Sequence, residues 1–251
     1  MGVSVTWDYS ELAATYDRRA DYSDDAIAFL LEKAGVTAGE TVADIGAGTG
    51  KMTTKLVGRG LNVHAVEPND AMRSFGEKNT EGKSARWTVG TGEATGLEDG
   101  TYPLVTFGSS FNVTDRPRAM AEACRILNGK GSMACLWNHR NLDNPLQKEV
   151  EQAIHSVIPS YGYGTRREDQ GPVLRDSGLF SNIEYGQFPF VVSVDVDDYV
   201  EAWRSHATLA RQAGDRFVEV VSAIETLVKA HGSAIEVPYH TVIWVAAQAT
   251  Q

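Results

Sequence analysis

The stretch that decides the fold is Val42-Ala43-Asp44-Ile45-Gly46-Ala47-Gly48-Thr49-Gly50, a short apolar strand that ends in a cluster of glycines. Glycine adopts positive φ without strain and lets a ligand approach the backbone closely. The residues that follow, 52–59, have the spacing of a helix, whose first N–H groups would face the same ligand. A strand, a glycine-rich turn and a helix in this order form a ligand-binding corner of open α/β sheets. The stretch therefore predicts a nucleotide site at the carboxyl end of the first strand.

The alternation of strands and helices continues to residue 140. Further strands are expected at residues 62–66, 86–89, 104–107 and 132–137, and further helices at 71–78 and 117–126. The strand runs are apolar without alternation, which is typical of strands buried on both faces. This order predicts an α/β fold with a doubly wound, mostly parallel sheet of the Rossmann-like kind.

Helical patterns also lie before and after this core. We expect one domain, with an N-terminal helical lid at residues 7–35, a nucleotide-binding core at 36–140, and a cap insertion after the fifth strand together with the terminal strands at 141–251. In the last part, helices are expected at 146–158, 196–213 and 215–230, and strands at 188–194 and 241–247. The two late strands would extend the sheet as an antiparallel edge.

Composition and charge narrow the class of protein. A content of 42% hydrophobic and 22% charged residues is that of a folded globule. The net charge of −10 argues against a nucleic-acid partner, because phosphate backbones are bound by clustered lysine and arginine. No signal peptide or membrane-spanning run is visible, and the two cysteines indicate buried thiols in a reducing compartment. We expect a cytoplasmic monomer or homodimer without a membrane partner.

The spacing of the glycines separates the possible nucleotides. A dinucleotide site expects G-x-G-x-x-G, whereas here the glycines fall as G-x-G-x-G and Lys51 stands at the third expected position. The second strand ends at Glu67, 21 residues after Gly46, where a carboxylate can accept hydrogen bonds from a ribose. An acid at this place suits both nicotinamide and S-adenosylmethionine (SAM) sites. The glycines favour SAM over a nicotinamide cofactor.

The chain resembles the class I SAM-dependent methyltransferases in several ordered segments. Residues 44–50 look like the first motif of that family and Val66-Glu67-Pro68 is similar to its second. Residues 90–94 and 109–112 match after the third and fourth strands, and residues 9–22 resemble the lid helix of the branch that contains trans-aconitate methyltransferase. The resemblance covers residues 9–140 well and the remainder loosely. It implies that SAM is bound and S-adenosylhomocysteine released.

Several roles follow from this resemblance. Asp44 would organise the glycine loop, Glu67 would hold the ribose, and Thr91 departs from the acid that many relatives use for the adenine amino group. The cofactor-binding residues that the resemblance implies are Tyr16, Arg19, Asp44, Gly46, Ala47, Gly48, Glu67, Pro68, Met72, Thr91, Gly92, Glu93, Ser109 and Ser110. Met72 at apolar helical spacing suits the core equally well, and Tyr16 and Arg19 can instead pack or lie in solvent.

Methyl transfer from a sulfonium is an in-line displacement that requires alignment and, for some oxygen nucleophiles, a base. The catalytic candidates are His139, after the fifth strand, and His206, in the cap. An acidic substrate needs no base, and Arg140, Arg166 or Arg167 would then hold it. The expected substrate-binding residues are Tyr9, Phe111, Asn112, Trp137, Asn138, Arg140, Tyr163, Arg166 and Trp203.

We therefore expect a methyltransferase that acts on O, N or C of a small molecule. The alternatives are an enzyme that binds SAM but performs a cyclisation or decarboxylation, and a nicotinamide-dependent oxidoreductase. No metal site is expected, because the histidines and acids lack close ligand spacing.

Overall fold

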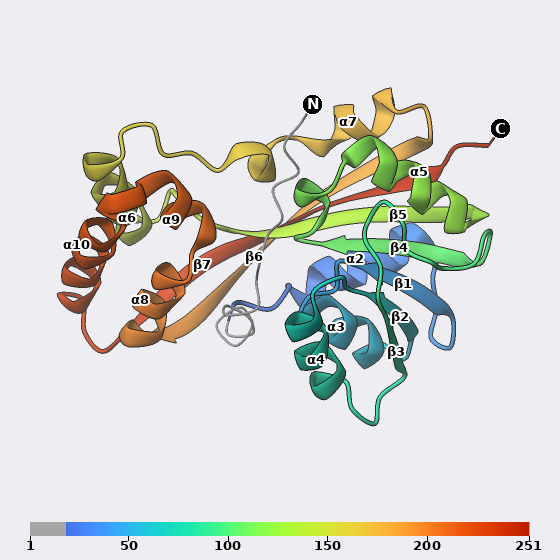
Figure 1. The fold of residues 1–251 in the computed structure, drawn as a ribbon, viewed down its shortest axis with the longest axis horizontal. Coiled ribbons are helices and arrows are strands. Elements are labelled where there is room, and N and C mark those ends of the chain that lie inside the picture. Colours follow the sequence, from blue (N-terminus) through green and yellow to red (C-terminus); the bar gives the residue numbers. More distant parts are fainter. Residues whose placement is uncertain (1–18, 251) are drawn as a thin grey trace.

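A seven-stranded sheet runs through the residues that the computed structural model describes, 19–250 (Figure 1). Its strands are β1 (Thr41–Ile45), β2 (Asn62–Val66), β3 (Ala85–Thr88), β4 (Tyr102–Gly108), β5 (Leu127–Arg140), β6 (Phe180–Asp195) and β7 (Ala234–Gln248). They lie in the order β3-β2-β1-β4-β5-β7-β6. The first five are parallel, while β7 is antiparallel to both β5 and β6. The order reverses between β1 and β4, and open α/β sheets bind ligands at that point.

Helices cover both faces of the sheet. On one face, α2 (Asp24–Ala34) and α3 (Lys51–Gly58) pack with the inward side chains of β1, β2 and β4. On the other, α5 (Arg116–Ile126) and α7 (Gln170–Asp176) pack with β4, β5 and β7. A further helix, α4 (Asp70–Asn79), contacts β3. Successive residues of β1 belong to the two different cores, which explains why this strand is apolar without alternation.

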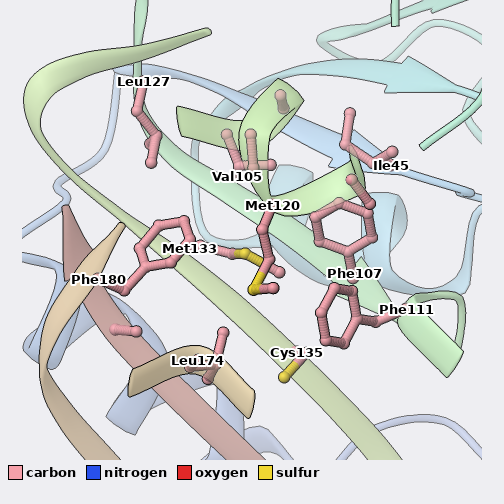
Figure 2. Packing of buried hydrophobic residues seen from close by; sticks show 14 of the residues in the cluster. Ile45, Val105, Phe107, Phe111, Met120, Leu127, Met133, Cys135, Leu174 and Phe180 are labelled. Atoms are coloured by element: carbon pink, nitrogen blue, oxygen red, sulfur yellow. The ribbon is translucent and has the colours of Figure 1, made fainter. Parts of the chain in front are cut away.

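Figure 2 shows the core that lies beneath α5 and α7. Phe107 at the end of β4 meets Phe111, in the short turn η2 (Phe111–Val113), with ring centroids 5.5 Å apart. Cys135 lies in the same core without a disulfide partner, and burial raises the pKa of its thiol. The other cysteine, Cys124, is half-buried and also free. The pattern of one buried and one half-buried thiol corrects the expectation that both are buried.

A second lobe, the cap, has a hydrophobic core of its own. It contains α6 (Pro145–Val157), α8 (Val196–Arg204), α9 (Ala207–Ala213) and α10 (Phe217–Lys229), with the short turns η3 (Gly164–Arg167) and η4 (Gly214–Arg216). The long strands β5, β6 and β7 leave the sheet together and carry this lobe, at the left of Figure 1. Their ladder continues to the pairs Arg140–Tyr239 and Asp195–Ala234. The cap is therefore joined to the sheet by paired strands, not by a linker.

The fold class is confirmed, including the antiparallel late strands. Three local expectations were wrong. β5 continues to Arg140 instead of ending at Trp137, because residues 138–140 pair with β7. β6 and β7 are each about twice the expected length, since their polar outer residues hide the strand pattern. The helix expected over 196–213 is two helices, and α7 was not expected because Gly171 and Pro172 lie in its first turn.

The part of the expected lid before residue 19 lies outside the described residues. Among the helices that are described, none combines the length and the apolar character needed to cross a membrane.

Candidate functional site

A cavity of about 1310 Å³ lies between the carboxyl ends of β1, β2 and β4 and the cap. The glycine loop, the end of β2 and residues 107–110 line it at the sheet. Residues 138–140, η3, β6 and α8 line it at the cap. The volume exceeds what most single small-molecule ligands fill, so two molecules can be held together there.

The glycine loop at the sheet end is built so that only glycine fits. Gly46, Gly48 and Gly50 have φ of 65°, 58° and 84°. A Cβ on Gly46 would lie 2.5 Å from the Cβ of Ser110. The backbone N–H groups of Gly46 and Ala47 both donate to the carbonyl of Val66, at 2.8 and 3.1 Å. The loop is therefore fixed against the end of β2 and leaves an open face toward the cavity.

Asp44 supports this loop from below. Its carboxylate is fully buried and accepts hydrogen bonds from the hydroxyls of Thr53, at 2.6 Å, and Thr106, at 3.0 Å. These bonds join β1 to α3 and β4. Burial raises the pKa of Asp44 to about 6; the two hydroxyls oppose this shift and the nearby charge of Glu67 adds to it.

Glu67 ends β2 at the rim of the cavity. Its two carboxylate oxygens accept from the backbone N–H groups of Gly48 and Asn69, both at 2.9 Å, and burial raises its pKa. Each carboxylate oxygen can accept more than one hydrogen bond, so a ligand hydroxyl can still be bound. Thr49 of the glycine loop also lines the cavity. Its Oγ1 atom is buried and has no hydrogen-bond partner among the described residues.

The turn after β4 completes the wall at the sheet. Ser109 has φ of 59°, a left-handed conformation that costs energy for any residue except glycine, and its hydroxyl lies 3.0 Å from that of Tyr22. Ser110 donates to the carbonyl of Ile45 at 2.6 Å. The turn thus positions two hydroxyl-bearing residues against the glycine loop.

Two further expected cofactor segments border the same space. Thr91 and Ala94 bond to each other across a tight turn, and a Cβ on Gly92 would lie 2.6 Å from Cγ2 of Thr114. Met72 is 4% exposed and would meet a Cβ on Gly48 at 3.6 Å, so it packs beside the loop while also lining the cavity. Both interpretations of Met72, core residue and site residue, are compatible with this position.

Arg140 is the centre of a polar network in the cap. It donates to Gln147, Glu151 and Tyr163, each at 2.9 Å, and its guanidinium lies 4.3 Å from the ring centroid of Trp203. Both members of the Arg140–Glu151 ion pair are nearly buried, with side chains 11% and 12% exposed. The charge of Arg140 is therefore partnered within the protein, and its first role is to hold the cap together.

The two arginines of η3 are held differently. Arg166 donates to the carbonyl of Asn138 at 3.2 Å, and Arg167 donates to that of Arg140 at 3.2 Å while its guanidinium lies 4.3 Å from the ring centroid of Tyr163. Among the described residues no carboxylate forms an ion pair with Arg167, and its Nε atom is buried without a partner. Burial lowers the pKa of Arg167. Both arginines line the cavity.

The two candidate histidines carry their hydrogen on the same ring nitrogen, Nε2, but for different reasons. The Nε2 atom of His139 lies 3.1 Å from the carbonyl of Arg166, and because a carbonyl only accepts, Nε2 carries the proton. In His206, Nδ1 accepts from the backbone N–H of Leu209 at 3.1 Å, so a neutral ring carries its proton on Nε2. Burial, with the nearby arginine charges, lowers the pKa of His139 to about 3 and that of His206 well below its usual range. Both rings are neutral at pH 7.

The cavity is divided by charge. At the sheet end the lining includes the carboxylates of Asp44, Glu67, Glu93 and Asp25, while Asp21 and Asp24 form ion pairs with Lys51 and Lys55, which also line the cavity. At the cap end the lining includes Arg19, Arg140, Arg166 and Arg167, against Asp195 and Asp198. A cation is favoured at the sheet and an anion at the cap.

The expected site residues fall into three groups. Lining the cavity are His139, His206, Arg19, Asp44, Gly46, Ala47, Gly48, Glu67, Pro68, Met72, Thr91, Gly92, Glu93, Ser109, Ser110, Asn138, Arg140, Tyr163, Arg166 and Trp203. Phe111, Asn112 and Trp137 do not line it: the two aromatic rings are fully buried in the core, and Asn112 accepts from the indole N–H of Trp137. Tyr9 and Tyr16 lie outside the described residues.

Other lining residues were not anticipated. Thr49 stands between Gly48 and Gly50, and this position in the glycine loop is the sequence signal that could have identified it. Residues 192–195 of β6 and Tyr239 of β7 also line the cavity. These two segments are brought to it by strand pairing between distant parts of the chain, which no local pattern reveals.

Comparisons with known proteins bear on the family and the fold. Residues 43–135 match a family model described as a methyltransferase domain. An uncharacterized methyltransferase of Mycobacterium tuberculosis is 34% identical over 134 residues, 53% of this chain and 53% of that protein, so the chain spans about half the length of the curated relatives it matches. The resemblance to class I SAM-dependent methyltransferases is confirmed for this region, while the trans-aconitate branch stays a prediction.

Two solved structures show the same fold. A protein of Anaeromyxobacter dehalogenans, described as a type II methyltransferase, has a TM-score of 0.67 at 17% identity over 91% of this chain and 97% of its own. A Haemonchus contortus phosphoethanolamine N-methyltransferase in complex with SAM has a TM-score of 0.56 at 14% identity over 98% of this chain and 61% of its own. At such identities the likeness concerns the fold alone.

Proposed function

Because residues 43–135 form a methyltransferase domain of the class I fold, we propose that the chain transfers a methyl group from SAM to a small molecule held beneath the cap. The observation that carries this proposal is one continuous cavity, with the glycine loop and Glu67 at one end and the cap at the other. A cofactor at the loop and an acceptor at the cap would then face each other. The accepting atom, O, N or C, stays open.

The residues at the sheet end fit SAM. The glycine loop brings its backbone to the edge of the cavity, and a Cβ on Gly46 would clash with Ser110. The buried hydroxyl of Thr49 has no partner within residues 19–250. The carboxylates of Asp44, Glu67 and Glu93 give this end a negative potential that suits a cofactor with a sulfonium and an ammonium group. Glu67 would accept from the ribose, and the loop would lie under the methionine portion.

When bound, SAM supplies an activated methyl group, so the chain has to bind, orient and exclude water. The turn at Ser109 and the ring of Tyr22 would close the wall beside the loop. The cap, held by Arg140 and its partners, would cover the acceptor. In this arrangement the chain would accelerate methyl transfer mainly by aligning the two bound molecules.

We do not assign a general base to His139 or His206. A ring with a pKa of about 3 is a weak base at pH 7, and Nδ1 of His206 is already occupied by Leu209. We therefore expect a methyl acceptor that histidine does not have to deprotonate. His139 and His206 would instead bind and orient the acceptor.

The test has two parts, binding and transfer. We expect S-adenosylhomocysteine to bind in a calorimetric titration and Glu67→Gln to weaken it about 10- to 100-fold, since a charged hydrogen-bond acceptor is lost. Glu219→Gln, an exposed acid of the cap, is the matched control and should leave the affinity unchanged. Binding of NAD without S-adenosylhomocysteine would contradict the proposal.

Transfer is followed with SAM that carries a tritiated methyl group and a panel of small acids, amines and phenols. Label in a product supports the proposal. Tight binding of SAM with conversion to an unmethylated product would replace it by the cyclisation or decarboxylation alternative.

A further inference from the structure

The break between α8 and α9 is made by a histidine. His206 has extended backbone torsions, φ −81° and ψ 92°, and its Nδ1 accepts from the N–H of Leu209, so it is the N-cap of α9. Its ring lies 5.1 Å from that of Trp203 between centroids, tilted by 36°. Trp203 in turn lies under the guanidinium of Arg140. The ring of His206 is therefore held on one edge by a helix and on one face by an indole.

This position determines which ring nitrogen of His206 carries the hydrogen. Because Nδ1 is an acceptor toward the helix, a neutral ring carries its hydrogen on Nε2. His206 lines the cavity, and Nε2 lies on the opposite edge of the ring from the helix contact. Burial, and after it the positive charges of Arg19, Arg166 and Arg140, lower the pKa of His206 and keep the ring neutral. The ring is thus a permanent donor that does not switch with pH in the neutral range.

Around this donor guanidinium groups outnumber carboxylates: Arg19, Arg140, Arg166 and Arg167 line the cap end against Asp195 and Asp198, and Glu151 pairs with Arg140. Arg140 and Arg166 lie close enough to act on His206 electrostatically, and Arg167 adds to the same end of the cavity a guanidinium without a carboxylate partner among the described residues. Arg167 is half-buried, and its buried Nε atom has no hydrogen-bond partner among the described residues, which is unfavourable unless a ligand supplies one. A pocket that combines hydrogen-bond donors with positive charge favours an anionic ligand group.

We propose that the cap end of the cavity binds an anionic group of the acceptor substrate, a carboxylate or a phosphate, and that His206 determines specificity there by donating a hydrogen bond from Nε2. Arg167 supplies the compensating charge. The inference rests on the proposed function in taking this molecule to be the methyl acceptor. It places the anionic group at the cap and the cationic cofactor at the glycine loop.

The chain offers a pair of substitutions that separate the two edges of the ring. In His206→Asn, the side-chain oxygen can still accept from Leu209, because asparagine is among the best N-caps, but the donor at the Nε2 position is lost. In His206→Gln, the amide can reach the Nε2 position while the N-cap is lost. We expect His206→Asn to keep the melting temperature within about 1 °C and His206→Gln to lower it by about 2 to 4 °C.

The probes are inorganic phosphate and succinate, titrated into the full chain saturated with S-adenosylhomocysteine and labelled with ¹⁵N-histidine. We expect the His206 signals to show a neutral ring protonated on Nε2 between pH 6 and pH 8, and the Nε2 resonance to shift saturably with one of the anions. Whichever anion saturates at the lower concentration identifies the group. His206→Asn and Arg167→Gln should each weaken that binding about tenfold or more, while Arg118→Gln, on the exposed side of α5, should not.

A proton on Nδ1, titration of His206 near its usual pKa, or equal anion affinity in the wild type and His206→Asn would overturn the inference. Binding of S-adenosylhomocysteine is measured in the same samples. If it persists while neither anion shifts His206, the anion site is wrong and the proposed function stands. If it is absent, the proposed function itself fails.

Discussion

Replacing Asp44 with asparagine removes a buried charge from beneath the glycine loop while keeping the shape of the side chain. In the wild type, burial raises the pKa of this carboxyl from its ordinary 3.8 to about 6. The folded chain therefore holds the proton more tightly than the unfolded chain does. The stability that this group contributes is complete below about pH 4 and is lost as the pH rises to about 6.

The magnitude follows from the difference between the two pKa values. From 3.8 to about 6, with 1.36 kcal/mol for each pH unit, ionisation of Asp44 costs the fold about 3 kcal/mol at pH 8 and about 1 kcal/mol at pH 4.5. Asparagine carries no such cost and can still accept from one of the hydroxyls of Thr53 and Thr106. The stability of Asp44→Asn relative to the wild type should rise by about 2 kcal/mol between these pH values.

The assay is urea unfolding followed by tryptophan fluorescence at several pH values between 4.5 and 8. Every other titrating group is common to both proteins, so the difference between their free energies of unfolding isolates Asp44. A difference that stays constant within a few tenths of a kcal/mol across this range would refute the reasoning. It would mean that Asp44 is ionised in the fold with an ordinary pKa.

Three further substitutions test the geometry of the site. Gly46→Ala should abolish S-adenosylhomocysteine binding in calorimetry, whereas Gly35→Ala, with φ of 66° but open space around it, should cost about 1 kcal/mol and leave binding intact. Arg140→Met should lower stability by about 3 to 5 kcal/mol in urea unfolding because it leaves Glu151 buried and unpaired; adding Glu151→Gln should recover part of the loss, and no recovery would contradict the ion pair. Ser109→Gly should be about 1 kcal/mol more stable than Ser109→Ala, and equal stabilities would argue against strain at this turn.

The sheet end of the site could be predicted from the order of residues along the chain. The glycine loop, Asp44 and Glu67 lie within 24 consecutive residues, 44–67, and a strand, turn and helix bring them together by local geometry. The spacing of Gly46, Gly48 and Gly50 marks the positions where the backbone has positive φ, which glycine adopts without strain. The grouping of these residues at one end of the cavity could therefore be predicted without the structure.

The tertiary structure decided the cap end. Trp137 and Phe111 were expected to bind substrate, yet both are core residues. Trp137 is buried where β5 pairs with β7, and Phe111 of η2 is buried against Phe107. The same strand pairing places Arg140 opposite Tyr239, which lies far away in the sequence, and α8 brings Trp203 against the guanidinium of Arg140. The proton positions of His139 and His206 depend on the carbonyl of Arg166 and the N–H of Leu209. The type of a residue determines which chemistry its side chain can perform. Its protonation state and its contacts depend on long-range strand pairing and burial, because the groups that determine them are distant in the sequence.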